Sequence, residues 1–206
     1  MHHYPRISVT GVILAGGRAK RMGGQDKGLI LLAGQPMAAH AVQIMRPQVG
    51  ELLINANRHI DDYRTLCCPV VRDDAGEFFG PLAGMLAAID VARTPYVLTV
   101  PCDSPLIPAD YAERMYHALM REGAEISVAS SGERLQPVFA LLSTKLRDSL
   151  REYLEAGERK IDHWFAGHRT AVADFSANPE MFRNINTPEE LAALEEEIMR
   201  GSQTMP

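Results

Sequence analysis

Residues 12–28 read Val12-Ile-Leu-Ala-Gly-Gly-Arg-Ala-Lys-Arg-Met-Gly-Gly-Gln-Asp-Lys-Gly28. The four apolar residues at the start of this stretch predict a short buried strand. Gly16 and Gly17 then let the chain turn and let backbone amides come close to a ligand. The remainder is a loop that carries four cations and one acid. Because amides and cations both stabilise phosphate oxygens, this strand, turn and basic loop together indicate a polyphosphate-binding site.

The basic loop differs from two common phosphate-binding motifs. A P-loop requires Gly-Lys before Ser or Thr, and the sequence contains no Gly-Lys pair. A dinucleotide fingerprint requires Gly-x-Gly, which Gly16-Gly17 does not supply. The alternative is a surface turn with solvated charges, whose cations are Arg18, Lys20, Arg21 and Lys27. The entropy lost in ordering so many glycines favours a functional use of this backbone.

Composition and charge restrict the class of protein. The chain has 206 residues, 46% hydrophobic and 23% charged, which fits one α/β domain spanning residues 1–206. A net charge of −5 argues against a general nucleic-acid binder, because counterion release requires a basic surface. No apolar run is long enough to span a bilayer, and the first residues lack the apolar core of a signal peptide. We expect no nucleic-acid or membrane partner and a cytoplasmic location.

The three cysteines, Cys67, Cys68 and Cys102, do not predict a disulfide framework. They are odd in number, and no Cys-x-x-Cys pattern indicates a thiolate zinc site. Cys102 lies beside Asp103, but no neighbouring residue in the sequence marks an activating base. We therefore expect Cys102 to be a small buried residue rather than a nucleophile.

Alternating strand and helix patterns predict a three-layer α/β/α fold with a mainly parallel sheet. Short apolar runs predict strands at residues 12–15, 51–55, 69–71, 95–100, 125–130, 136–142 and 171–175. Helical patterns cover residues 36–45, 80–92, 108–122, 144–156 and 161–165. Near the end, Thr187-Pro-Glu-Glu190 is a capping box that opens a helix with Pro at its first position. Leu191, Leu194 and Ile198 mark the buried stripe of that helix.

Polar residues follow several of the predicted strands directly. Ligands of open parallel sheets bind beyond the carboxyl ends of the strands, so these residues should converge on one edge. Asn55 offers donors and an acceptor to a nucleobase edge, or it is a turn residue. Asp73 and Asp74 bind ribose, base or metal, or they form a solvated turn. The sequence alone leaves each of these alternatives open.

Asp103 is the main candidate for a metal ligand. It follows the strongest predicted strand and lies between Pro101 and Pro105, which stiffen the backbone. Mg²⁺ takes hard oxygen ligands and needs only one or two carboxylates when phosphates and water supply the others. The alternative is that Asp103 caps the turn that follows it, since Asp is common in turns.

The motif Leu14-Ala-Gly-Gly-x-x-x-Arg-Met-Gly-Gly-x-Asp-Lys-Gly28 resembles the signature loop of nucleotidyltransferases with a Rossmann-like GT-A fold. Within that superfamily the chain looks most like the molybdenum cofactor guanylyltransferases, the MobA family. The resemblance covers nearly the whole chain. Further matching motifs are Asn55, Asp73, Phe79-Gly-Pro-Leu-Ala-Gly84, Pro101-Cys-Asp-Ser-Pro105, Gln136-Pro137 and Asn184-x-Asn-Thr-Pro-Glu-Glu190.

The resemblance implies an Mg²⁺-dependent enzyme that joins GMP from GTP to the terminal phosphate of molybdopterin and releases pyrophosphate. It implies contacts with molybdenum cofactor assembly proteins as well. Arg21, Lys27 and Asp103 would be catalytic, and Asp103 would hold the metal. The implied nucleotide-binding positions are Leu14, Ala15, Gly16, Gly17, Lys27, Asn55, Asp73 and Asp103. The implied acceptor-binding positions are Gln136, Asn184 and Asn186, with a looser match at Arg159-Lys160.

Two rival functions share parts of this pattern. A molybdopterin cytidylyltransferase or a sugar-phosphate nucleotidyltransferase would have the same loop, metal and fold. The resemblance favours guanine, because cytidylyltransferases more often carry Ala-Ala-Gly where this chain has Leu14-Ala-Gly-Gly17. A non-catalytic GTP sensor is the other rival. The retention of Arg21, Lys27 and Asp103 argues against it.

Overall fold

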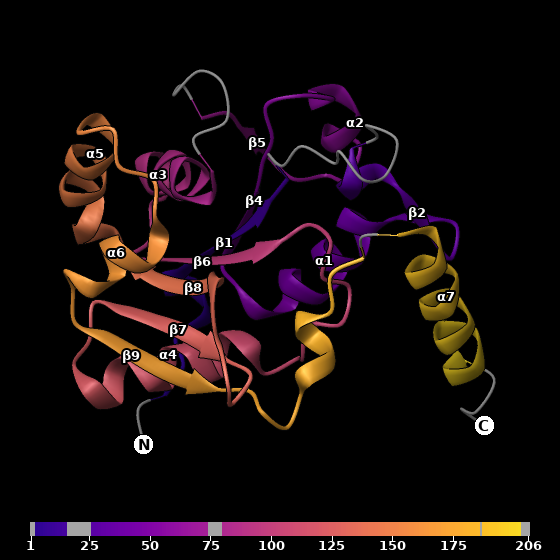
Figure 1. Ribbon diagram of the computed structural model, residues 1–206. Coiled ribbons are helices and arrows are strands. Elements are labelled where there is room, and N and C mark those ends of the chain that lie inside the picture. The colour runs from indigo at the N-terminus through magenta and orange to yellow at the C-terminus, as the bar shows by residue number, and fades with distance from the viewer. Residues whose placement is uncertain (1–2, 16–25, 74–79, 186, 203–206) are drawn as a thin grey trace.

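The computed structural model describes residues 3–15, 26–73, 80–185 and 187–202. A seven-stranded sheet forms its centre, in the order β5-β4-β1-β6-β8-β7-β9 (Figure 1). The strands are β1 (Val9–Leu14), β4 (Glu51–Asn55), β5 (Val70–Val71), β6 (Tyr96–Pro101), β7 (Ile126–Ser130), β8 (Leu135–Ser143) and β9 (Thr170–Asp174). Two further strands, β2 (Leu31–Leu32) and β3 (Gln35–Pro36), form a separate small hairpin.

Helices cover the sheet on both faces, as Figure 1 shows, while α7 stands beside the β2–β3 hairpin. The α-helices are α1 (Met37–Met45), α2 (Ile60–Arg64), α3 (Pro81–Val91), α4 (Tyr111–Glu122), α5 (Arg147–Glu155), α6 (Ile161–Ala166) and α7 (Pro188–Ser202). One core cluster joins α1 and α4 to the sheet, and a second joins α3, α5 and α6 to the other face. The predicted three-layer α/β/α fold is confirmed.

Strand β1 is at the centre of the fold because it is paired on both sides. All six of its residues are buried, and successive side chains enter opposite core clusters. Ile13 packs with α1 and α4, and Leu14 packs with α3. Both neighbours, β4 and β6, run parallel to β1. An apolar run buried on both faces is typical of a parallel sheet, and this explains the continuous apolar stretch that begins residues 12–28.

The sheet is mainly parallel but has one reversed strand. Four neighbouring strands, β5, β4, β1 and β6, are parallel, and β7 is parallel to β9. Strand β8 lies between β6 and β7 and is antiparallel to both. The N-terminal end of β8 therefore lies at the same edge of the sheet as the carboxyl ends of the other strands.

Several boundaries differ from those predicted. Helix α1 begins at Met37, because Pro36 pairs with Leu31 in the β2–β3 hairpin. Helix α4 begins at Tyr111 instead of residue 108. Helix α2 was not predicted. It has five residues and follows His59, whose φ of 52° is in the left-handed region, so it has neither a usual cap nor a full amphipathic repeat.

The predicted capping box at α7 is present. Glu190 N donates to Thr187 Oγ1 at 3.2 Å, and Thr187 N donates to Glu190 Oε2 at 3.1 Å. Leu191 and Leu194 pack against Leu32, Met37 and Ile185, so α7 is attached to the β2–β3 hairpin. The side chain of Ile198 lies outside the described residues. None of the described helices combines the length and the apolar character that crossing a membrane requires.

We predict that Thr187→Ala destabilises α7 by about 1 kcal/mol, the usual cost of losing an N-cap. The first turn of α7 should then exchange its amide hydrogens faster. Hydrogen–deuterium exchange measured by mass spectrometry tests this. Thr187→Ser keeps the hydroxyl and is the matched control. Equal protection of residues 188–191 in the alanine and serine variants contradicts the prediction.

Candidate active site

The parallel register brings the predicted strand-end residues to one edge of the sheet. Leu14 is paired with Asn55 of β4 on one side and with Pro101 of β6 on the other, and Asn55 is in turn paired with Val71. Ala15 N donates to Asn55 O at 2.8 Å, and Cys102 N donates to Leu14 O at 3.1 Å. The backbone of Leu14 and Ala15 is thus fixed between the backbones of the two neighbouring segments.

An ion pair joins the basic loop to the end of β6. Lys27 Nζ lies 2.9 Å from Asp103 Oδ2, and the two side chains are 23% and 11% exposed. Lys27 begins a short 3-10 helix (Lys27–Leu29), and Asp103 follows β6. Two residues separated by 76 positions therefore meet at the sheet edge. Their low exposure reduces solvent screening, so the charges stay effective toward a ligand.

A buried carboxylate anchors the turn that carries Lys27. Asp26 is 7% exposed, and its Oδ1 accepts hydrogen bonds from Gly28 N at 3.2 Å and from the Tyr63 hydroxyl at 2.5 Å. Burial raises the pKa of Tyr63, with further contributions from Cys102 and Asp26, so the hydroxyl stays protonated and donates. Tyr63 comes from α2 and is fully buried. Its hydrogen bond to Asp26 therefore helps to fix the turn that carries Lys27.

Gly28 permits this close packing. A Cβ added at Gly28 would lie 2.4 Å from the Tyr63 hydroxyl and 3.2 Å from Cys102 Cβ. Any larger residue would thus push Tyr63 away from Asp26. Sequence reasoning did not identify Tyr63, because it lies in an unpredicted helix and no motif surrounds it. The glycine at position 28 is the sequence feature that fits a bulky side chain packed there, but it does not identify that side chain as Tyr63.

Asn55 and Asp73 lie on the other side of β1 from Asp103. Asn55 is 2% exposed, and its Nδ2 is 3.4 Å from Val71 O. A Cβ added at Gly84 would lie 2.3 Å from Asn55 Oδ1, so the first turn of α3 packs directly on this amide. Asp73 is half-buried. Asn57 Nδ2 donates to Asp73 Oδ1 at 2.6 Å, and Asp73 N donates to Asn57 Oδ1 at 3.1 Å.

Of the predicted acceptor positions, Gln136 lies on β8, beyond the other side of β6, and Asn184 lies beside Ile185, which packs with Leu32 and Met37. Gln136 is half-buried near the start of β8, and Asn184 is exposed in the segment before α7. An aromatic contact connects these two segments, because the rings of Phe139 and Phe182 meet edge-on with centroids 5.2 Å apart. The structure thus brings the two segments near each other but gives no contact between Gln136 and Asn184 themselves.

Several predicted site residues lie outside the described part of the chain. They are Gly16, Gly17, Arg18, Lys20, Arg21, Asp74 and Asn186.

Cys102 is buried against the site, as expected from the sequence. Its burial raises the pKa of its thiol well above the ordinary value, and the nearby carboxylates of Asp103 and Asp26 raise it further. The thiol stays protonated at neutral pH and is a poor nucleophile. Cys102 therefore packs beside Gly28 as a buried thiol.

Comparisons with known proteins identify the family. A family model described as MobA-like NTP transferase domain matches residues 11–172. The chain belongs to the MobA-like NTP transferase family. It is 51% identical over 194 residues to a Shewanella sediminis protein named molybdenum cofactor guanylyltransferase, covering 94% of this chain and 99% of that one. A Shewanella woodyi protein of the same name is 48% identical, with the same coverage.

A solved structure shares the fold of this chain. The crystal structure of molybdopterin-guanine dinucleotide biosynthesis protein A from Archaeoglobus fulgidus matches with a TM-score of 0.76 and 19% identity. The match covers 93% of this chain and 99% of that one. The resemblance to the MobA family and the nucleotidyltransferase fold predicted from the sequence are both confirmed.

We predict that the three thiols differ strongly in reactivity toward Ellman's reagent at pH 8. Cys67 is exposed, whereas burial raises the pKa values of Cys68 and Cys102 and keeps both as thiols. One thiol should react quickly in the native protein and three after denaturation. Cys67→Ser should remove the fast phase. Rapid reaction of that variant contradicts the assignment.

We predict that Tyr63→Phe lowers the free energy of unfolding by about 1.5–3 kcal/mol, because the Asp26 carboxylate loses one of its donors. Urea denaturation measures the change. Tyr153→Phe is the matched control, because the Tyr153 hydroxyl donates to Lys160 O at 2.8 Å on the protein surface. If both variants lose equally little stability, the buried hydrogen bond does not anchor the turn.

Proposed function

We propose that this protein transfers GMP from GTP to the terminal phosphate of molybdopterin, with release of pyrophosphate. The observation that carries the proposal is the identity of 51% and 48%, over 94% of the chain, with relatives named molybdenum cofactor guanylyltransferase. The Lys27–Asp103 pair at the carboxyl edge of the sheet supports it, because this edge is where α/β folds bind nucleotides.

In this proposal the nucleotide lies across the ends of β1, β4, β5 and β6. Lys27 faces its phosphates, together with the backbone that follows Leu14 and Ala15. Asn55 and Asp73 lie on the side proposed for the base and the ribose. Their mutual spacing is set by the parallel register and by the Asn57–Asp73 hydrogen bonds, so this half is preorganised for binding.

The proposed reaction joins two phosphates. An oxygen of the acceptor's terminal phosphate forms a bond to the α-phosphorus of GTP, while the bond from that phosphorus to the bridging oxygen breaks. Pyrophosphate leaves with the electron pair. A phosphate monoester is largely dianionic at neutral pH, so the nucleophile needs no general base. Lys27, and Arg21 in the same loop, would offset the repulsion between the two anions and stabilise charge on the leaving group.

The residues at Asp103 fit a divalent cation, which we propose is Mg²⁺. Asp103 Oδ2 contacts Lys27, and Oδ1 accepts no hydrogen bond from any described residue. Next to it, Ser104 Oγ is buried and has no hydrogen-bond partner within the described ranges. The described part of the chain contains no cluster of three His, Cys, Asp or Glu ligands. In this proposal, phosphates and water would therefore complete the coordination shell of the ion. Such an ion supplies charge stabilisation for phosphates.

The acceptor would bind beside the end of β6, in the C-terminal part of the chain. Gln136 and the Asn184–Asn186 segment are the proposed contacts. The Phe139–Phe182 ring contact supports this grouping, because it joins β8, which carries Gln136, to the segment just before Asn184.

We predict that Lys27→Met and Asp103→Asn each reduce GMP transfer by about 10²- to 10³-fold, the usual cost of removing one group that stabilises transition-state charge. The assay offers molybdopterin, Mg²⁺ and each nucleoside triphosphate, and measures pyrophosphate and the dinucleotide product. Lys27→Met should also weaken GTP binding in calorimetry. Mg²⁺ titration should separate Asp103→Asn from the wild type by a higher Mg²⁺ requirement.

Exposed residues of the same types provide the controls. Lys145→Met and Asp61→Asn change a lysine and an aspartate at the surface, and both variants should retain wild-type rates. Turnover of CTP in place of GTP contradicts the assignment of guanine. Nucleotide binding without pyrophosphate release in the wild type contradicts the assignment of an enzyme.

A further inference from the structure

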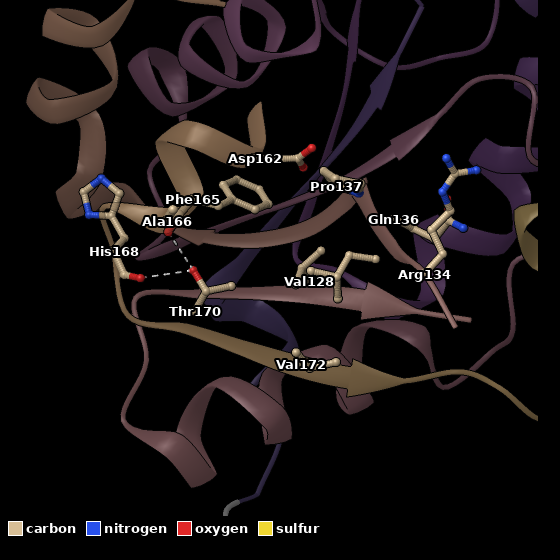
Figure 2. A pocket seen from close by; sticks show the side chains of 11 residues that line it. Val128, Arg134, Gln136, Pro137, Asp162, Phe165, Ala166, His168, Thr170 and Val172 are labelled. Atoms are coloured by element: carbon tan, nitrogen blue, oxygen red, sulfur yellow. Dashed lines mark hydrogen bonds between the residues drawn. The ribbon is translucent and has the colours of Figure 1, made fainter. Parts of the chain in front are cut away.

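A pocket of about 740 Å³ lies on the face of the sheet beneath α6 (Figure 2). Its floor is formed by β7, β8 and β9, and Figure 2 shows the ring of Phe165 extending from α6 above Val128 and Thr170. Val172 and Leu135 contribute apolar walls and are 44% and 47% exposed. The volume lies within the range of pockets that bind small molecules.

An irregularity in strand pairing forms this pocket. Val128 of β7 is paired with Ala140 of β8, but the next residue, Ala129, is paired with Gln136. Residues 137–139 of β8 thus have no partner in β7. Phe139 packs into the opposite core cluster, so its side chain does not fill this face. Bulges of this kind often lie beside functional sites and redirect side chains.

Three polar side chains at the pocket are available for a ligand. In the part of the chain that the structure describes, Arg134, Gln136 and Asp162 form no side-chain hydrogen bond or ion pair. Other polar groups there are already used. Thr170 Oγ1 donates to Phe165 O at 3.1 Å, and His168 Nε2 lies 3.0 Å from Ser149 Oγ. The available groups are therefore one cation, one amide and one carboxylate beside apolar walls.

The pocket extends toward the edge that carries Asp103. Strand β8 is antiparallel to β6, and Thr99 Oγ1 donates to Val138 O at 2.7 Å. Arg134 and Gln136 lie further toward the carboxyl end of β6 than this contact. Figure 2 shows their side chains together at one end of the pocket, with Asp162 over its middle and Thr170 at the other end.

We propose that this pocket binds the pterin ring system of the acceptor. This inference rests on the proposed function. The 2-amino-4-oxo edge of a pterin presents two adjacent N–H donors, which match the two oxygens of the Asp162 carboxylate. Phe165 and Val172 cover the faces of the flat rings. Arg134 and Gln136 then face the acceptor's phosphate, at the end of the pocket nearest to Asp103.

Guanine has the same donor edge as a pterin, so the experiment must separate the two. The probe is 6-hydroxymethylpterin, whose fluorescence is titrated with protein saturated with GTP. Asp162→Asn should raise its dissociation constant by about 10- to 100-fold, as expected for a lost hydrogen bond to a charged group. Val172→Trp, which fills the pocket, should abolish binding. Asp148→Asn on the surface of α5 is the matched control and should bind normally.

GMP transfer provides the second readout. Asp162→Asn should raise KM for molybdopterin by about tenfold or more, with kcat and the affinity for GTP unchanged. If Asp162→Asn and Val172→Trp both bind the pterin probe and show KM for molybdopterin as the wild type does, the inference is overturned and the proposed function is left intact. Weakened GTP binding in Asp162→Asn also overturns it, because the pocket would then hold guanine. Pterin binding by a wild-type protein that transfers no GMP contradicts the proposed function alone.

Discussion

The parallel pairing of β1 with both β4 and β6 is the constraint on which the rest of the structure depends. It sets Leu14 between Asn55 and Pro101, so three chain segments leave the sheet at one level. A shift of one residue in either pairing would turn the side chains of that strand to the opposite face. Such a shift costs the burial of residues such as Ile13 and Val12 in their separate core clusters. Core packing therefore determines the position of the candidate site.

The charges at this edge are placed by buried hydrogen bonds. Asp26 holds Gly28 N and is itself held by Tyr63, so the backbone on both sides of Lys27 is fixed. From this fixed backbone, Lys27 Nζ reaches to 2.9 Å from Asp103 Oδ2. A partly buried ion pair is weak support for stability, since desolvation offsets much of its attraction. The Lys27–Asp103 pair lies at the sheet edge where ligands bind, and a bound phosphate would share Lys27 with Asp103. This position fits a role in binding better than a role in stability.

The sequence predicted elements whose pattern is local. Strand β1, the capping box at Thr187 and the polar residues after β4, β5 and β6 all follow from neighbouring residues, and the structure has them. Helix α2 was missed because its five residues have no usual cap and no amphipathic repeat. Tyr63 was missed because its hydrogen bond to Asp26 crosses 37 positions and leaves no local pattern. The pocket beneath α6 was missed because it too depends on residues that are distant in the sequence. It requires the displaced pairing of β8 with β7, which depends on the partner strand and not on either sequence alone. Among the residues that line the pocket, Gln136 was the one that family resemblance had already assigned to acceptor binding.

The reversed direction of β8 would let one edge of the sheet serve the two proposed substrates. In a wholly parallel sheet, the start of every strand lies at the edge opposite the ligand. Because β8 runs against β6 and β7, its first residues, Leu135 and Gln136, lie beside the carboxyl ends of these strands. The bulge that follows opens the face beneath α6 at the same point. The donor side thus depends on parallel strands β5, β4, β1 and β6, and the proposed acceptor side depends on the interruption of that pattern. The boundary between them is β6, and Asp103 lies directly after it, where an acceptor phosphate would meet the nucleotide.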